Sequence, residues 1–189
     1  DFYEMFFEDA VTVSRELEIT LTGKDCGLEE RAPMCGIPYH AADTYIARLI
    51  QKGYKVAICE QVEDPKKAKG LVQRKVIKII TPGTTMTEGT LTEDENNFIC
   101  SIILRDGKYG IATADISTGQ FMVTEVDQAS KVLDEITKFE PSEIVTLEGQ
   151  DLFPEDDLST ETYNMLLQKL NIMVSPVSKS DFELKSSIE

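Results

Sequence analysis

The sequence lacks any long apolar run, and this absence narrows the classes of protein to which it can belong. No stretch approaches the roughly 18 consecutive apolar residues that a membrane-spanning helix needs. The first residues have no positively charged, apolar and small-residue leader, so we expect no secretory signal. Because no disulfide is expected among the cysteines, we expect a cytoplasmic protein. The chain also begins with Asp rather than Met, and we interpret it as a piece of a longer protein.

Side chains that perform chemistry are scarce. There is one histidine, His40, no Gly-x-x-x-x-Gly-Lys phosphate loop, and no serine or cysteine beside a recognisable base. The four cysteines lack the two-residue spacing of zinc and redox motifs, although Cys26 and Cys35 could meet across a loop. Cys59 and Cys100 lie in apolar runs and are predicted to behave as small hydrophobic residues. We therefore expect no enzymatic activity, metal or cofactor in this chain.

Charge is distributed unevenly along the chain. Residues 1–92 hold 12 Lys and Arg against 14 Asp and Glu, a net charge of −2, whereas residues 93–189 hold 7 against 20, a net charge of −13. This asymmetry indicates a domain boundary. The segment 65–84 is basic and has no acid; its cations are Lys66, Lys67, Lys69, Arg74, Lys75 and Lys78. These cations could neutralise phosphates. Alternatively, they could be solvent-exposed side chains of a loop and an edge strand that prevent aggregation of the sheet.

The opening residues have two interpretations. Apolar residues spaced by three and four, from Tyr3 to Leu17, predict a helix that starts near residue 1, with Asp1 and Glu4 as its capping box. In such a helix Phe2 and Glu4 would point to different sides. They would point the same way only if the first residues were extended.

The rest of the chain alternates between strand and helix patterns. In the first half we predict a strand over 17–22, a long loop over 23–40, a helix over 42–52, buried strands over 54–59 and 74–80, and a turn over 81–84. In the second half we predict three antiparallel strands over 98–104, 108–116 and 121–126, a helix capped by Asp127, a strand over 143–147, and a helix over 159–170 before the apolar stretch 172–174.

These elements predict an α/β protein with two domains. A small mixed-sheet α/β domain occupies residues 1–84 and a linker occupies residues 85–97. The order of strands and helices over residues 98–189 resembles the ribonuclease-H-like topology, and we expect this second domain to be incomplete at Glu189. A two-metal nuclease needs clustered carboxylates. The strand 98–104 has no acid, and Asp115 is better interpreted as a turn former.

Four motifs, in this order and at this spacing, resemble one known family. They are Asp1-Phe2-Tyr3-Glu4, the segment 33–40 (PMCGIPYH), the segment 57–65 (AICEQVEDP) and Thr81-Pro82-Gly83-Thr84. Together they are similar to the N-terminal half of the bacterial MutS family of DNA mismatch-repair proteins. The resemblance is strong over residues 1 to about 126 and weaker beyond.

The resemblance implies specific roles. The mismatch-reading domain of this family carries a Phe-x-Glu pair, so Phe2 would enter the minor groove as a wedge at mispaired or unpaired bases, and Glu4 would hydrogen-bond the base. The other residues expected at the DNA are Arg74, Lys75, Lys66, Lys67, Lys69, Met34, Tyr39 and His40. For Met34 and Tyr39 a role in the core stays open, and for His40 a structural role does.

The resemblance also implies partners and an assembly. The intact protein would be a nucleoid-associated homodimer whose ATP and Mg²⁺ site lies in a C-terminal domain that this chain does not contain. Residues 98–189 would be the connector domain, with a MutL-like repair factor as a partner. Two alternatives remain: an acidic protein-interaction module, and a fragment that binds no DNA by itself because the clamp needs two subunits.

Overall fold

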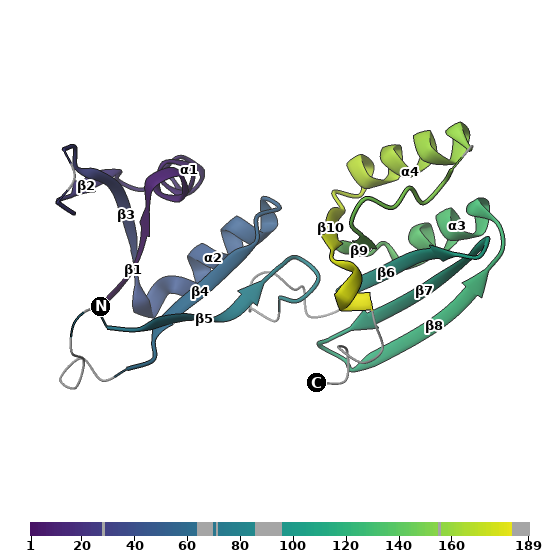
Figure 1. Ribbon diagram of the computed structural model, residues 1–189, viewed down its shortest axis with the longest axis horizontal. Coiled ribbons are helices and arrows are strands. Elements are labelled where there is room, and N and C mark those ends of the chain that lie inside the picture. The colour runs from purple at the N-terminus through teal and green to yellow at the C-terminus, as the bar shows by residue number, and fades with distance from the viewer. Residues whose placement is uncertain (28, 64–69, 71, 86–95, 155, 183–189) are drawn as a thin grey trace. The chain divides into compact units, whose positions relative to one another are not determined.

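The computed structural model describes residues 1–27, 29–63, 70, 72–85, 96–154 and 156–182. These residues form two compact units (Figure 1). The first unit covers residues 1–81, and the second takes residues 82–85 together with 96–182. Both units combine helices with strands, so the predicted α/β class is confirmed.

The first unit opens with a strand where the sequence predicted a helix. β1 (Phe2–Phe6) pairs antiparallel with β3 (Ala32–Pro38), and β3 also pairs with β2 (Thr22–Lys24), which gives the strand order β1-β3-β2. The capping-box interpretation of Asp1 and Glu4 is therefore wrong. The helical spacing of apolar residues is correct only from Phe7 onward, because pairing with a strand distant in the sequence determines the conformation of the first residues.

β3 occupies part of the segment that the sequence predicted as a long loop over residues 23–40. Its prolines suggested a loop because proline cannot donate a backbone hydrogen bond to a neighbouring strand. In β3, however, Pro33 faces only Gly23 of β2, and Pro38 faces only Phe2 of β1. The two neighbours overlap only at Met34, so each proline has a single strand beside it.

Two helices contact β3 of the three-stranded sheet. α1 (Phe7–Leu17) ends because Glu18 adopts a φ of 56° and its N–H donates to the Ser14 carbonyl oxygen. The strand predicted over 17–22 is therefore wrong. After the 3-10 turn η1 (Tyr39–Ala41) comes α2 (Ala42–Gln51), which confirms the predicted helix. The core of this unit is built from Leu17, Ile37, Ala42, Ile46, Leu49, Ile50 and Ile80.

β4 (Val56–Gln61) and β5 (Arg74–Ile80) form a separate two-stranded antiparallel sheet. Both strands were predicted, but the prediction that they are buried is wrong. Val76, Ile77 and Ile79 of β5 are 55 to 60% exposed, and Cys59 of β4 is also exposed. Every residue of β5 from Arg74 to Ile79 is exposed, so the described residues cover neither face of that strand, and α2 contacts this sheet chiefly through β4.

The second unit holds a five-stranded sheet. β6 (Phe98–Arg105), β7 (Lys108–Asp115) and β8 (Gln120–Val126) form the predicted antiparallel meander. β9 (Glu143–Leu147) pairs parallel with β6, and β10 (Met173–Val177) pairs parallel with β9. Asp106 and Gly107 have φ values of 51° and 74°, the left-handed conformation that a tight hairpin turn requires.

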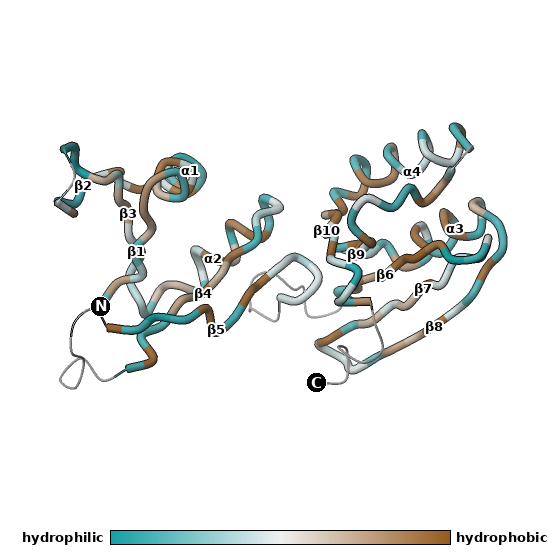
Figure 2. Tube along the Cα trace, in the orientation of Figure 1, coloured by the Kyte–Doolittle hydropathy of each residue, from teal (hydrophilic) through white to brown (hydrophobic). Residues whose placement is uncertain are grey.

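α3 (Ala129–Phe139) and α4 (Asp157–Lys169) lie on the same side of this sheet (Figure 1). Both helices were predicted, although the N-cap of α3 is Gln128 rather than Asp127, whose carboxylate instead pairs with Lys131 at 3.1 Å. β6 is brown along most of its length in Figure 2, and the side chains of Ile102 and Ile144 are fully buried. None of the helices in the described residues is long and apolar enough to cross a membrane.

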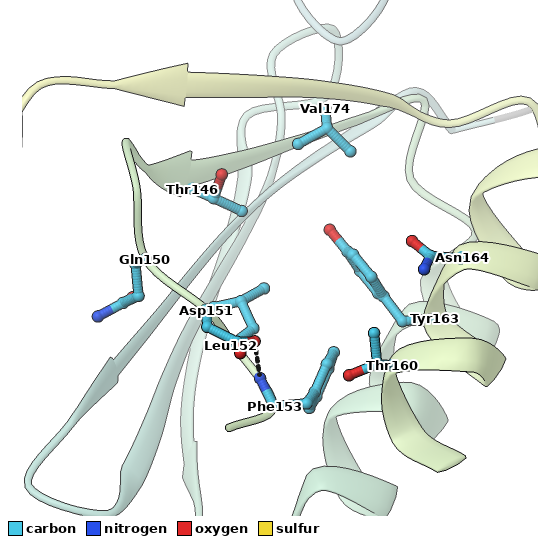
Figure 3. Close-up of a pocket in the computed structure, with 9 residues that line it drawn as sticks. All are labelled: Thr146, Gln150, Asp151, Leu152, Phe153, Thr160, Tyr163, Asn164 and Val174. Atoms are coloured by element: carbon cyan, nitrogen blue, oxygen red, sulfur yellow. Dashed lines mark hydrogen bonds between the residues drawn. The ribbon is translucent and has the colours of Figure 1, made fainter. Parts of the chain in front are cut away.

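The second unit also holds a small cavity between the end of β9 and α4 (Figure 3). Leu152, Phe153 and Tyr163 line it, and the Phe153 and Tyr163 rings meet edge to face with centroids 5.4 Å apart. Burial raises the pKa of Tyr163 to about 12. The aromatic lining belongs to the core of this unit, which includes Phe153 and packs against Tyr163.

Residues 82–84 of the predicted turn belong to the second unit and pack closely against its sheet. The Gly83 N–H donates to Glu143 Oε2 at 3.1 Å, and the Asn97 side-chain amide donates to the Pro82 carbonyl oxygen at 2.8 Å. A Cβ atom on Gly83 would lie 2.8 Å from the Cβ of Glu143 and 2.9 Å from the Cβ of Ile99. Only glycine fits so close to β6 and β9.

Candidate nucleic-acid interface

β1 presents alternate side chains to two different environments. Phe2, Glu4 and Phe6 share one face of the strand, because side chains at i and i+2 of an extended chain align. Tyr3 and Met5 point the other way and pack against the core of the first unit. The extended conformation therefore places Phe2 and Glu4 side by side, and the Phe2 side chain is 65% exposed.

The residues paired with these side chains complete an open face on the three-stranded sheet. We define this open face by its members on the three strands: Phe2, Glu4 and Phe6 of β1, Met34, Gly36 and Pro38 of β3, and Thr22 and Lys24 of β2. It combines aromatic and aliphatic surface with one acid and one base. Met34 is half-buried on it, between Phe6 and Thr22.

Gly36 allows the backbone of β1 to lie close to β3 beside Phe2. A Cβ atom at this position would lie 3.7 Å from Cδ1 of Phe2 and 3.3 Å from the Tyr3 carbonyl oxygen. The strand end is held by the Tyr39 N–H, which donates to the Asp1 carbonyl oxygen at 3.1 Å. Gly36 could not be recognised as a site residue from the sequence, because its effect depends on its pairing with Glu4.

Glu4 is paired with Lys24, which the sequence pattern did not identify as a site residue. Lys24 Nζ lies 2.7 Å from Glu4 Oε2, and the same ammonium group lies 5.3 Å from the centroid of the Phe6 ring. Both charged side chains are about half exposed. The three-residue strand β2 that carries Lys24 is too short for periodicity to reveal.

Contacts of the Tyr3 side chain, on the opposite face of β1, hold the strand in place. The Tyr3 hydroxyl donates to Glu60 Oε1, and this hydrogen bond, with burial, raises the pKa of Tyr3 to about 12. The Tyr3 ring stacks on Tyr39 with centroids 5.4 Å apart. Tyr39 is nevertheless 59% exposed, so a core role for it is wrong, and His40 is exposed as well. Both follow Pro38, the partner of Phe2.

The basic candidates fall into two groups. Arg74 and Lys75 are exposed at the start of β5, opposite Gln61 and Glu60 of β4. Lys66, Lys67 and Lys69 lie outside the described residues. Of these five basic residues, the structure therefore places Arg74 and Lys75, both on β5.

Asp115 has the structural role that the sequence predicted. Its Oδ1 accepts hydrogen bonds from the Ser117 N–H at 2.8 Å, the Ser117 hydroxyl at 2.6 Å and the Thr118 N–H at 3.3 Å. Burial raises the pKa of Asp115, but these hydrogen bonds outweigh it and lower the pKa below its ordinary value. Among the described residues no group of three or more His, Cys, Asp or Glu side chains could hold a metal ion.

Comparison with known proteins gives two matches that together span almost the whole chain. The family model for MutS domain I matches residues 1–89, and that for MutS domain II matches residues 97–189. Among solved structures, T. thermophilus RuvC in complex with Holliday junction substrate aligns over 49% of this chain and 73% of that chain, with 11% identity. Its TM-score of 0.35 is too low to support a conclusion.

Curated relatives carry the name DNA mismatch repair protein MutS. The protein of Lachnoclostridium phytofermentans is 67% identical over 145 residues, which cover 77% of this chain and 16% of the relative. That of Acetivibrio thermocellus is 54% identical over 192 residues, which cover 100% of this chain and 21% of the relative. That of Clostridium novyi is 62% identical over 152 residues, which cover 80% and 17%. The chain thus spans about a fifth of the length of these relatives and belongs to the MutS family, of which it comprises domains I and II.

Proposed function

We propose that this chain is the mismatch-recognition part of a DNA mismatch-repair protein, and that the open face contacts the mispaired or unpaired base. The observation that carries the proposal is the side-by-side placement of Phe2 and Glu4 on an exposed strand face. An exposed aromatic side chain beside a carboxylate has no stabilising role in the core of this unit. It is available to a partner.

Phe2 acts as a wedge. Proteins that bind in the minor groove insert apolar side chains between base steps, at a cost of a few kcal/mol of unstacking, and gain a bent duplex that wraps more protein surface. A mismatched or unpaired base has already lost part of its pairing, so the insertion costs less there. Recognition then depends on local deformability rather than on base sequence.

Glu4 supplies the polar interaction with the base. A carboxylate surrounded by DNA phosphates is disfavoured in its ionised form. The protonated acid can then donate a hydrogen bond to the displaced base. Met34 lies on the open face opposite Phe6, and Tyr39 and His40 follow Pro38, the partner of Phe2, in the chain. Their closeness to the strand that carries the wedge supports a contact of these three residues with the groove.

Arg74 and Lys75 position the protein on the phosphates, together with Lys66, Lys67 and Lys69. Changing Arg74 and Lys75 to Gln should weaken matched and mismatched binding alike and should lower the salt slope by roughly two, about one for each phosphate that is no longer neutralised. The slope is measured from binding isotherms over a series of salt concentrations. A matched control changes Arg105 and Lys108, which are exposed in the acidic second half. An unchanged slope in the Arg74/Lys75 variant would show that these cations are only solvated surface.

One titration tests the proposal directly. The chain and the full-length protein are each titrated by fluorescence anisotropy against a matched duplex and a duplex with one G·T mismatch, at stated low salt. We expect the full-length protein to prefer the mismatched duplex, because insertion of Phe2 costs less at a mispaired base. Weaker binding by the chain alone would show that the homodimer is needed to enclose the DNA from two sides. Equal affinity of the full-length protein for both duplexes would contradict the proposal.

A second candidate function concerns residues 98–189. The net charge of −13 over residues 93–189 disfavours contact with DNA. Phe121 and Val123 are 69% and 68% exposed on the edge strand β8. We therefore propose that this half is a connector that binds protein, with a MutL-like repair factor as its partner, while ATP and Mg²⁺ bind elsewhere in the intact cytoplasmic protein.

A further inference from the structure

Lys24 has two partners on the open face, and both bear on recognition. Its ammonium group pairs with Glu4 at 2.7 Å and lies over the Phe6 ring at 5.3 Å. β2 carries it to this position, because Thr22 and Lys24 lie on the same side of that strand as Met34 does on β3. Among the described residues it is the one cation on the open face.

The ion pair conflicts with the role of Glu4 at the base. A positive charge at hydrogen-bond distance stabilises the ionised carboxylate, and it occupies one of the oxygen atoms that would face the base. While Lys24 Nζ donates to Oε2, that oxygen cannot contact the base. Recognition of a base through this oxygen therefore requires that Lys24 leave.

The pair can be broken at low cost. Both side chains are about half exposed, and exposed ion pairs add little net stability because water screens them. The stem of Lys24 can stay against the Phe6 ring while its ammonium group moves, because the lysine side chain is long and flexible. A phosphate is the strongest competing acceptor that DNA would bring to this face.

We propose that Lys24 exchanges partners when DNA binds, leaving the Glu4 carboxylate for a backbone phosphate. Lys24 is thus a positioning residue that holds the Glu4 carboxylate in the free protein and releases it at the DNA. This inference rests on the proposed function, because it assigns a regulating partner to the same site. It also predicts one more neutralised phosphate than the β5 cations provide.

The test uses the full-length protein with Lys24→Met, which removes the charge but retains an apolar stem over Phe6. Binding to matched and G·T-mismatched duplexes is measured over a salt series. We expect the salt slope to fall by about one on both duplexes. Lys24→Arg, which keeps the charge, should retain the slope. The matched control is Lys138→Met, because Lys138 also lies between a glutamate, Glu135 at 3.3 Å, and an aromatic ring, Phe139 at 4.5 Å, but in the second unit.

The release of Glu4 is tested by combining Lys24→Met with Glu4→Gln. When Lys24 is present, Glu4→Gln frees its ammonium group for the phosphate. The gain in affinity that Glu4→Gln produces should therefore be several-fold larger with Lys24 than in the Lys24→Met background. A salt slope that Lys24→Met leaves unchanged, or equal gains in both backgrounds, would overturn the exchange. If the unmodified full-length protein bound matched and mismatched duplexes equally well, the proposed function would be contradicted instead. The two failures can thus be told apart.

Discussion

Replacing Phe2 with alanine is expected to remove the preference of the full-length protein for mismatched over matched duplex. Much of the background affinity should remain, because the interactions with phosphates supply it. Stacking of an aromatic side chain on a base is worth about 1–3 kcal/mol. We therefore expect mismatch affinity to fall by about tenfold or more, and matched affinity to change little.

The exposure of Phe2 makes this variant informative. Because the side chain is 65% exposed, its removal should change the free energy of unfolding by no more than about 0.5 kcal/mol, which a denaturant titration would check. Phe121→Ala is the matched control, since Phe121 is 69% exposed on a strand of the second unit. Unchanged mismatch selectivity in Phe2→Ala would rule out the wedge and leave Phe2 as an exposed surface residue.

The conformation of Phe2 could not be predicted from local pattern. The spacing of apolar residues from Tyr3 onward is the spacing of a helix, and the Asp1-to-Glu4 interval is that of a capping box. What decides the outcome is pairing with β3, in which Phe2 faces Pro38 and Glu4 faces Gly36. Such non-local pairing leaves no periodic signal near residue 1. Only the resemblance to a family pointed to Phe2 and Glu4 as a pair.

The second unit was predicted more accurately because its signals are local. Asp106-Gly107 lies between two apolar runs, and these residues adopt the conformation that the hairpin turn needs. In the first unit, Pro33 and Gly36 suggested a loop, although they lie in β3. Lys24 was missed for the same reason as β3: its position opposite Glu4 exists only once β1, β3 and β2 have paired.

Glu4→Gln should separate two mechanisms by the sign of its effect. If Glu4 binds the base in its protonated form, complex formation takes up a proton, and mismatch affinity should fall as the pH rises across neutrality. Protonating an ordinary glutamate at pH 7 costs roughly 3.7 kcal/mol. Glutamine, a neutral donor of nearly the same shape, avoids that cost, so Glu4→Gln should hold or improve total affinity and should abolish the pH dependence.

The same substitution should narrow discrimination. Relief of repulsion between the carboxylate and the phosphates favours matched duplex as well, so matched affinity should rise at least as much as mismatched affinity. Binding isotherms for both duplexes over a pH series measure both effects. Glu125→Gln is the matched control, because Glu125 forms a similar exposed ion pair, with Lys108 at 2.6 Å, in the second unit.

The opposite result has an equally definite meaning. If Glu4 binds ionised, as an acceptor from a base amino group, mismatch affinity should stay flat across neutral pH and Glu4→Gln should weaken binding. In that case Lys24 could remain at 2.7 Å in the complex, since it would stabilise the form of Glu4 that binds. A Glu4→Gln protein that binds mismatches more weakly and keeps its pH profile would therefore refute protonation and leave the salt slope of Lys24→Met to decide whether Lys24 leaves.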